Sequence, residues 1–291
     1  YCNAVPVFMD CEPETLCIDV QKTSDFISRK CEQRRDGYTY NKETRRRVKA
    51  VIPVHIFGHP VDMDPLLEVC KRNNIDIIED ATESLGSEYK GARTGSLGRI
   101  GCFSFNGNKI ITTGGGGMIV TSDDGIAKRA RHLTTQAKKD PFEYDHDEIG
   151  YNYRLTNIQA AMGVAQMERI DEFVEAKRKN ASIYRELLSD INDIRFLWEM
   201  PWAKSNFCFY TIKAPKGHRT PLMKHLLSKD IQVRPVWKLI HTLPMYKEHQ
   251  AYEIQNAIQI YETSLNLPCS VVLKREQIEF VSENIHYYFS K

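Results

Sequence analysis

The sequence predicts an α/β protein in which a mostly parallel sheet is sandwiched by helices and is followed by a small C-terminal α+β domain. In the first half, short apolar runs alternate with helical stretches, as in parallel sheets whose strands are buried on both faces. After Thr156 a long helical pattern separates this half from a second group of strands and helices. We therefore expect a large domain over residues 1–170 and a small domain over residues 171–291, joined by the long helix.

The predicted strands of the first half lie at residues 4–10, 49–58, 75–80, 98–106 and 116–123. Between the second and the third, "DMDPLLEVCKRNN" puts its apolar residues on one face of a helix, which gives a βαβ unit. Ligands of such sheets bind at the carboxyl ends of the strands. The residues that lie at or just past such ends are His55, Asp80 and Lys109.

Residues 22–50 are strongly charged and interrupt this pattern. A basic patch for a polyanion within residues 28–49 is one interpretation, but charge runs are usually solvated, so we favour an exposed helix and loop. The formal net charge of +2 gives no overall field that argues for nucleic acid or a membrane surface. We therefore expect neither as a partner.

The second half begins with Thr156-Asn157-Ile158-Gln159, which fits a capping box, and apolar residues continue at helical spacing to about Leu188. A strand at 207–214, a helix at 221–229, a strand at 231–237 and a terminal helix at 275–290 follow. This pattern is typical of a small α+β domain.

The eight cysteines form no Cys-x-x-Cys pair and no Cys/His cluster at zinc-ligand spacing, so we expect free thiols of a reducing cytoplasm and no metal site. No apolar stretch approaches the ~20 residues of a membrane span. The chain begins with Tyr1 and reads at once as a strand. This start suggests that an N-terminal segment of the fold is missing.

The stretch "FSFNGNKIITTGGGGM" (103–118) holds one lysine and four consecutive glycines. It is not a phosphate-binding loop of a nucleoside triphosphatase, because Asn108 precedes Lys109 and Ile110 follows it. It is not a dinucleotide-binding fingerprint either, because its glycines precede a strand. What remains is a lysine just past a buried strand, with Ser104 before it and Asp80 at the end of another strand.

This combination suits pyridoxal phosphate. A lysine in a partly desolvated pocket can form a Schiff base, and the pyridine nitrogen needs a carboxylate partner, which Asp80 can supply. Each residue also has a structural interpretation: Asp80 as a turn or cap residue, Lys109 as a solvated side chain, Ser104 as a strand serine, and the glycines as a tight turn.

The motifs "VHIFGHPVDMDPL", "IEDATESLGSEYKGARTGSLGRIGCFSFNGNKIITTGGGGMIVT", "EIGYNYRLTNIQAAMGVAQME" and "RPVWKLIHTLPMY" together resemble the DegT/DnrJ/StrS nucleotide-sugar aminotransferases, which have the type I pyridoxal-phosphate transferase fold of aspartate aminotransferase. The resemblance is strongest to the 4-aminotransferases of legionaminic acid and bacillosamine pathways in bacteria. It implies transfer of an amino group from glutamate, which leaves 2-oxoglutarate, to the C4 keto group of a nucleotide-linked deoxysugar for surface glycans. It also implies a homodimer with shared active sites.

The resemblance further implies that Lys109 binds the cofactor covalently and that Asp80 pairs with its pyridine nitrogen. Ser104 would bond the phosphate, and Asn152 would reach the phosphate in the neighbouring subunit. Glu83 stands near the ring hydroxyl, where many members have Gln or His. The phosphate-gripping Gly-Thr segment and the stacking aromatic of the family are expected in the missing N-terminal part.

Cationic and aromatic side chains are candidates to bind the sugar nucleotide, because arginine suits a diphosphate. These candidates are His146, Arg154, Arg234, Trp237, His241 and Tyr246. Interface packing of Trp237 and Tyr246 and a surface position of His146 are open alternatives, as is a purely structural role of His55.

Two further functions remain open at this point. One subgroup of the family dehydrates sugars and has histidine in place of the reactive lysine, so Lys109 argues against it. The other alternative is a noncatalytic, N-terminally truncated remnant or dimerising scaffold of the family.

Overall fold

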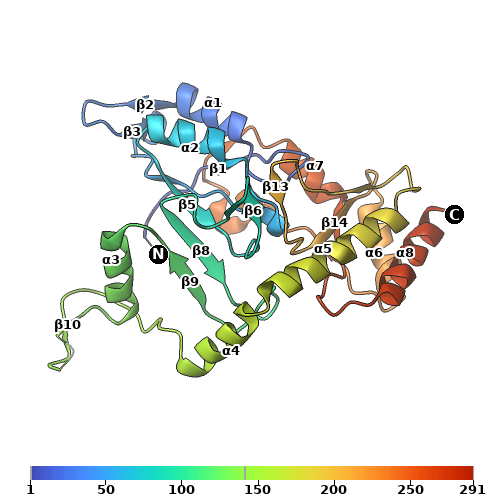
Figure 1. Ribbon diagram of the computed structural model, residues 1–291. Helices are drawn as coiled ribbons and strands as arrows, with labels where there is room; N and C mark the ends of the chain where they lie inside the picture. The colour runs from blue at the N-terminus through green and yellow to red at the C-terminus, as the bar shows by residue number, and fades with distance from the viewer. Residues whose placement is uncertain (1, 141, 291) are drawn as a thin grey trace.

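The structure is a computed structural model that describes residues 2–140 and 142–290. Its first four-stranded sheet has the order β4 (Ala50–Val51), β5 (Asp76–Asp80), β8 (Ile100–Ser104) and β9 (Gly117–Val120). The first three strands are parallel, and β9 runs antiparallel to β8 along the edge (Figure 1). The βαβ unit predicted from the sequence is present, with α2 (Met63–Arg72) between β4 and β5.

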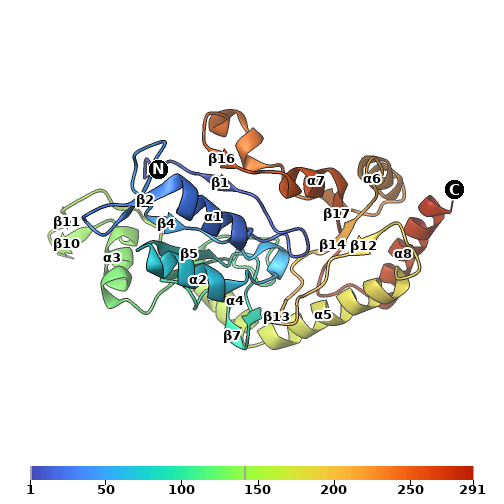
Figure 2. The ribbon, with the colours of Figure 1, turned by 90° about the horizontal axis from the view of Figure 1, so that it is seen from above.

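Two helices cover one face of this sheet. They are α1 (Val20–Lys30) and α2 (Figure 2). The core beneath them contains Phe26, Leu66 and Ile77. Burial along β5 alternates: Ile77 and Glu79 are buried, whereas Ile78 and Asp80 are only partly buried. The expectation that the strands are buried on both faces therefore does not hold for β5, because no helix of the described chain seals its second face.

The charged stretch 22–50 forms most of α1 and a hairpin of β2 (Cys31–Gln33) and β3 (Thr39–Asn41). The helix buries Thr23, Phe26 and Ile27 and leaves its charged side chains outside. The expectation of an exposed helix is thus correct, but the expected loop contains paired strands.

The predicted long helix is two helices, α4 (Asn157–Met167) and α5 (Ile170–Leu187). The capping box between Thr156 and Gln159 is present. The helix ends because the backbone N–H of Arg169 donates to the carbonyl of Gln166, which tightens the last turn, and Arg169 then leaves helical geometry with φ −116° and ψ 12°.

The second four-stranded sheet is antiparallel, in the order β12 (Arg195–Phe196), β14 (Tyr210–Lys213), β17 (Ser264–Leu267) and β15 (Arg234–Pro235). Helix α5, α6 (Arg219–Leu227) and α8 (Arg275–Phe289) share its core, which includes Tyr184, Leu226 and Ile285. The predicted strands at 207–214 and 231–237 are longer than β14 and β15. The sequence patterns missed α7 (Asn256–Thr263) and β17.

Short elements connect the two sheets. Strand β1 (Phe8–Met9) pairs with β16 (Ala251–Tyr252), so residues near the start of the chain lie beside a segment of its second half. Strand β13 (Ala203–Lys204) pairs with the hairpin of β6 (Glu88–Tyr89) and β7 (Ala92–Arg93). The remaining elements are α3 (Asp124–Thr134), β10 (Lys138–Asp140), β11 (Asp145–His146) and the 3₁₀ turns η1 (Ile56–Gly58), η2 (Ile240–Thr242) and η3 (Pro244–Tyr246).

All eight cysteines are free thiols. Among the helices that the structure describes, none combines the length and the apolar character needed to cross a bilayer.

Candidate active site

The carboxyl ends of three neighbouring strand segments meet at one edge of the first sheet. Val54, just past β4, bridges to Asp80 at the end of β5, and the N–H of His55 donates to the Asp80 carbonyl at 3.1 Å. Asp80 in turn lies opposite Cys102 of β8, two residues before Ser104. The loop from Phe105 to Gly116 follows and carries Lys109. The edge where sheets of this kind bind ligands therefore holds Asp80, Ser104 and Lys109 together.

Lys109 faces a buried carboxylate. Its Nζ lies 3.7 Å from Oε1 of Glu83, and the two side chains are only 13% and 7% exposed. The other carboxylate oxygen, Oε2, accepts the backbone N–H of Phe57 at 2.8 Å. Burial raises the pKa of Glu83, and the nearby charge of Asp80 acts in the same direction, against Lys109 and the Phe57 amide. Glu83 is thus an acidic group in a place that disfavours its charge.

Phe57 holds this carboxylate from an unusual backbone conformation. It lies in η1 with φ 55° and ψ 19°, in the left-handed region that non-glycine residues rarely adopt. Its ring contacts Phe209, at 5.4 Å between centroids, and Trp237, at 6.5 Å. The amide that positions Glu83 is therefore connected to aromatic residues of the second half of the chain.

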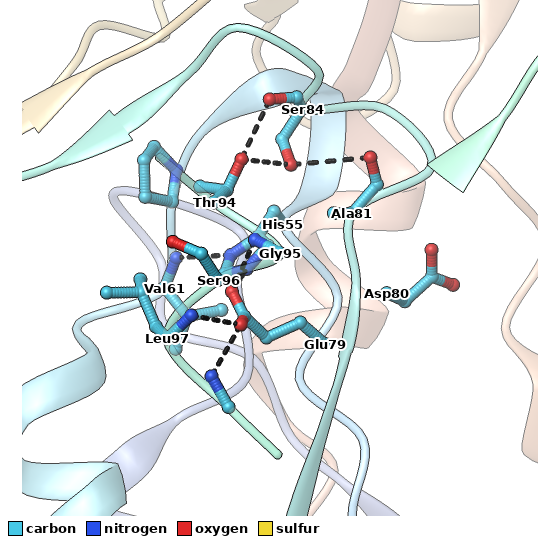
Figure 3. Close-up of polar contacts among 12 residues, drawn as sticks. His55, Val61, Glu79, Asp80, Ala81, Ser84, Thr94, Gly95, Ser96 and Leu97 are labelled. Atoms are coloured by element: carbon cyan, nitrogen blue, oxygen red, sulfur yellow. Dashed lines mark hydrogen bonds and ion pairs between the residues drawn. The ribbon is translucent and has the colours of Figure 1, made fainter. Parts of the chain in front are cut away.

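Glu79 and Asp80 are adjacent in β5 but serve opposite faces of the sheet (Figure 3). Asp80 is partly buried and accepts one hydrogen bond, from the N–H of Thr82 at 3.1 Å. Its carboxylate therefore retains capacity for a further partner. Glu79 points into the protein.

On the inward side of β5, Glu79 and His55 form a buried hydrogen-bond network. Glu79 accepts the backbone N–H groups of Gly95, Leu97 and Gly98 at 2.6–2.7 Å, and it contacts Nε2 of His55 at 2.8 Å. Nδ1 of His55 accepts the N–H of Val61, so Nε2 carries the proton and donates it to Glu79. Although burial alone would raise the pKa of Glu79, these hydrogen bonds lower it. Glu79 thus orders the loop at residues 95–98, and both ring nitrogens of His55 are engaged, with Glu79 and with Val61.

Ser104 and the glycine run frame the lysine loop. The hydroxyl of Ser104 accepts the N–H of Asn106 at 3.3 Å, which folds the loop back at its start. Gly114 and Gly116 have φ of 75° and 86°, so the glycines make the tight turn that leads into β9. Gln166 of α4 holds this turn by accepting the N–H of Thr112 and donating to its carbonyl.

The residues at this edge fit pyridoxal phosphate. They offer an amine for the aldehyde, the Asp80 carboxylate for the ring nitrogen and the Ser104 hydroxyl for an anionic group. Space beside the loop is open, since a Cβ added to Gly107, Gly114 or Gly115 would meet no atom within 4 Å. Both the functional groups at this edge and the open space beside the loop therefore suit pyridoxal phosphate.

The other predicted binding residues lie in two groups apart from Lys109. Asn152, His146 and Arg154 are exposed; Asn152 bridges to Thr135, and Nδ1 of His146 contacts the carbonyl of Gln136. In the second half, Trp237 is 50% exposed and reaches the site through Phe57, Tyr246 packs against Phe8, and Arg234 and His241 are at or near the surface. Within residues 2–140 and 142–290, no contact joins either group directly to Lys109.

Three residues at the site were not predicted. They are Phe57, Cys208, and Asn206, whose side chain donates to the carbonyls of Glu83 and Leu85 at 3.0 and 2.9 Å. Only Gly58, a glycine directly after Phe57, hinted at a special backbone in the sequence. The approach of Asn206 and Cys208 is a tertiary contact that no local pattern encodes.

One exposed cluster outside this edge has ligand-type side chains. Atoms of His132, Asp147 and Glu148 lie within 4.8 Å of one another. Arg129 already forms an ion pair with Glu148, and Nε2 of His132 contacts Asp147 at 2.7 Å. The cluster is therefore a surface ion-pair network and supports no metal site.

Comparison with known proteins gives a consistent match along the chain. The model of the DegT/DnrJ/EryC1/StrS aminotransferase family matches residues 1–286. The chain is 36% identical to a GDP-perosamine synthase of Escherichia coli O157:H7 over 297 residues, covering 100% of this chain and 74% of that protein. It is 38% identical to the putative pyridoxal phosphate-dependent aminotransferase EpsN of Bacillus subtilis, covering 90% of this chain and 65% of that protein.

Solved structures agree with this match. An aminotransferase of the same family from Brucella abortus has a TM-score of 0.88 at 26% identity, with 98% of this chain and 74% of that chain covered. DesV of S. venezuelae, in complex with a ketimine intermediate, has a TM-score of 0.85 at 25% identity, with 97% and 72% covered. The fold is therefore that of a type I pyridoxal-phosphate-dependent transferase, as the sequence predicted. The chain belongs to the DegT/DnrJ/EryC1/StrS family of pyridoxal-phosphate-dependent sugar aminotransferases.

Proposed function

We propose that this chain transfers an amino group from glutamate to the C4 keto group of a nucleotide-linked deoxysugar for bacterial surface glycans. The observation that carries the proposal is a partly buried Lys109 beside Glu83, at the sheet edge where Asp80 and Ser104 also lie. Relatives named GDP-perosamine synthase and UDP-4-amino-4,6-dideoxy-N-acetyl-beta-L-altrosamine transaminase support the substrate class. Eight free cysteines, four of them buried, suit a reducing cytoplasm.

Bound pyridoxal phosphate supplies an aldehyde for Lys109 and a ring that withdraws electron density from the substrate carbon. Asp80 would pair with the ring nitrogen, and Ser104 would bond the phosphate. The Nζ of Lys109, once released, would carry a proton to or from the substrate carbon. Such proton transfer contributes about 10² to 10⁴-fold to the rate of a step.

We also propose a homodimer with shared active sites. Helix α4 buries none of its residues in the described chain, and β9 is an exposed edge strand. Both elements and the loop before α4 carry exposed apolar side chains, which are those of Met118, Ile119, Ile149, Ile158, Met162 and Val164. Clustered exposed apolar side chains are typical of subunit interfaces. The exposed residues Asn152 and Arg154 in the loop before α4, and His146 in β11, would reach the site of the partner subunit.

The second half of the chain would bind the sugar nucleotide. Trp237 offers a half-exposed ring next to Phe57, and Arg234 offers a guanidinium for a diphosphate. A division into domains at residue 170 is supported by the core around Tyr184 and Leu265, whose buried residues all follow that position, whereas the core around Leu66 and Ile77 also includes Tyr252. The substrate would then bind between the domains.

The test incubates the purified protein with pyridoxal phosphate, glutamate and a panel of 4-keto sugar nucleotides with guanosine, uridine and thymidine diphosphate. Mass spectrometry follows the amino sugar product. We expect product with the intact chain, none with Lys109→Ala, and unchanged product with the surface control Lys90→Ala, because the exposed ammonium of Lys90 pairs with the surface carboxylate of Asp64. Equal product from Lys109→Ala would overturn the proposal. No product from any substrate would favour the scaffold alternative.

A further inference from the structure

The pair of Lys109 and Glu83 carries an inference that goes beyond the proposed function and rests on it. Lys109 must be a neutral amine when it attacks an aldehyde, yet its neighbour at 3.7 Å is a carboxylate that stabilises the charged ammonium. Each time Lys109 binds or releases the cofactor, its charge changes within a largely buried site. A group close by has to accommodate that change.

The surroundings of Glu83 single it out. Asp80 at the end of β5 adds a second negative charge, and Phe57 in η1 contributes an amide donor to one oxygen. Cys208, before β14, is also close, but burial raises the pKa of its thiol to about 12, so it is neutral. In the described part of the chain, Lys109 is the one cation paired with Glu83.

Loss of the lysine charge would leave Glu83 buried beside Asp80 without a cation. Burial already raises the pKa of Glu83, and the ion pair with Lys109 is one of the few interactions that oppose this shift. Removing the ion pair with Lys109 favours the protonated form of the Glu83 carboxyl group. The proton that Lys109 loses comes from its Nζ, which lies 3.7 Å from Oε1 of Glu83.

We propose that Glu83 is the base that takes the proton from Lys109 when the lysine condenses with an aldehyde, and that it holds this proton while the lysine is bound. The ammonium of Lys109 carries three hydrogens. One passes to the Glu83 carboxylate, and the other two leave with the carbonyl oxygen as water when the carbon–nitrogen double bond forms. No oxidant or reductant is needed, and release of Lys109 returns the proton.

Infrared difference spectroscopy tests this directly, with the protein measured before and after loading with pyridoxal phosphate. We expect a carbonyl stretching band of one protonated carboxyl group per modified Lys109. The band should be absent in Glu83→Gln and retained in Glu14→Gln, which changes an exposed glutamate. Glu83→Asp should keep an acid band at a shifted frequency, so the assignment does not depend on one variant.

A parallel sample is reduced with borohydride and its lysines are mapped by mass spectrometry. If Lys109 is labelled but no band depends on residue 83, Glu83 does not hold the proton and this inference fails alone. If Lys109 is not labelled, the proposed function fails and the inference with it. The two failures are therefore distinguishable.

Discussion

At the scale of single residues, Glu83 is an acidic side chain held where its charge costs free energy. Burial raises its pKa above the value of 4.5 for a free side chain. The folded protein therefore binds this proton more tightly than the unfolded chain does. It follows that the contribution of Glu83 to stability is fully present below pH 4.5 and is lost as the pH rises through the folded pKa.

Replacing Glu83 with a residue that cannot ionise removes this loss of stability at higher pH. In the cofactor-free protein, we expect the melting temperature of Glu83→Gln to fall less than that of the original chain as the pH rises from about 5 to 8. Glutamine can still accept the Phe57 amide, so the local structure is retained. Glu14→Gln is the matched control, and parallel curves for all three proteins would contradict the assignment.

The candidate residues predicted from the sequence are those whose positions follow from where the strands end. Asp80, Ser104 and Lys109 could be placed at one sheet edge because parallel strands end at the same side. Phe57 and Asn206 could not, because one depends on a left-handed backbone at a non-glycine residue and the other on a contact with the distant carbonyl of Glu83.

At the scale of elements, the conformation of η1 depends on glycine at position 58. Its φ is 91°, and a Cβ there would lie 1.9 Å from Oδ1 of Asn206 and 2.9 Å from the backbone nitrogen of Cys208. Gly91 has a similar φ of 84° but open space around it. Comparing substitutions at Gly58 and Gly91 therefore separates the cost of backbone strain from the cost of steric overlap.

We expect Gly58→Ala to lower the free energy of unfolding by roughly 2 to 5 kcal/mol, from strain of about 1–2 kcal/mol and overpacking of about 1–3 kcal/mol. Gly91→Ala should cost only the strain. Urea denaturation monitored by circular dichroism measures both. Equal costs at the two positions would mean that Asn206 moves aside freely.

A buried aspartate ties the start of the chain to α7. The fully buried Asp10 accepts the N–H groups of Gln255, Asn256 and Ala257 at 2.8–3.1 Å and pairs with Lys22 at 2.5 Å. Burial alone would raise the pKa of Asp10, but these bonds lower it. Its contribution to stability is therefore present above pH 3.8 and is lost as the pH falls through the folded pKa.

We expect Asp10→Ala to destabilise the protein by roughly 3 kcal/mol, because it leaves a partly buried lysine and a helix N-terminus without their carboxylate. Asp64→Ala removes an ion pair of the same 2.5 Å length at the surface and should cost much less, because solvent screens the two charges. Thermal unfolding at pH 7 compares them. A cost for Asp10→Ala as small as that of the surface variant would show that α7 does not depend on this link.

The elements that sequence patterns predicted well are those with strong local signals, such as α2 with its apolar face and α4 with its capping box. The break between α4 and α5 was missed because apolar spacing continues through Arg169. Helix α7 was missed because its N-terminus is capped by Asp10, far away in the sequence.

At the scale of the whole molecule, the exposed apolar side chains of α4 and β9 predict the assembly. We expect Ile158→Glu to convert a dimer into monomers at micromolar concentration, because it places a charge among the exposed apolar side chains of α4. Ile158 is 77% exposed in the isolated chain, and Val272, at 78%, is an equally exposed control in the second half. Sedimentation equilibrium measures the mass. Identical masses for Ile158→Glu, Val272→Glu and the original chain would contradict the interface.

The whole account depends on one lysine. The most direct measurement loads the protein with pyridoxal phosphate, fixes the bond with borohydride and maps the labelled peptide by mass spectrometry. We expect the label on Lys109, because this amine is partly buried beside Glu83 at the edge that holds Asp80 and Ser104. A label confined to other lysines, such as the exposed Lys90, or no label on any lysine would contradict the account.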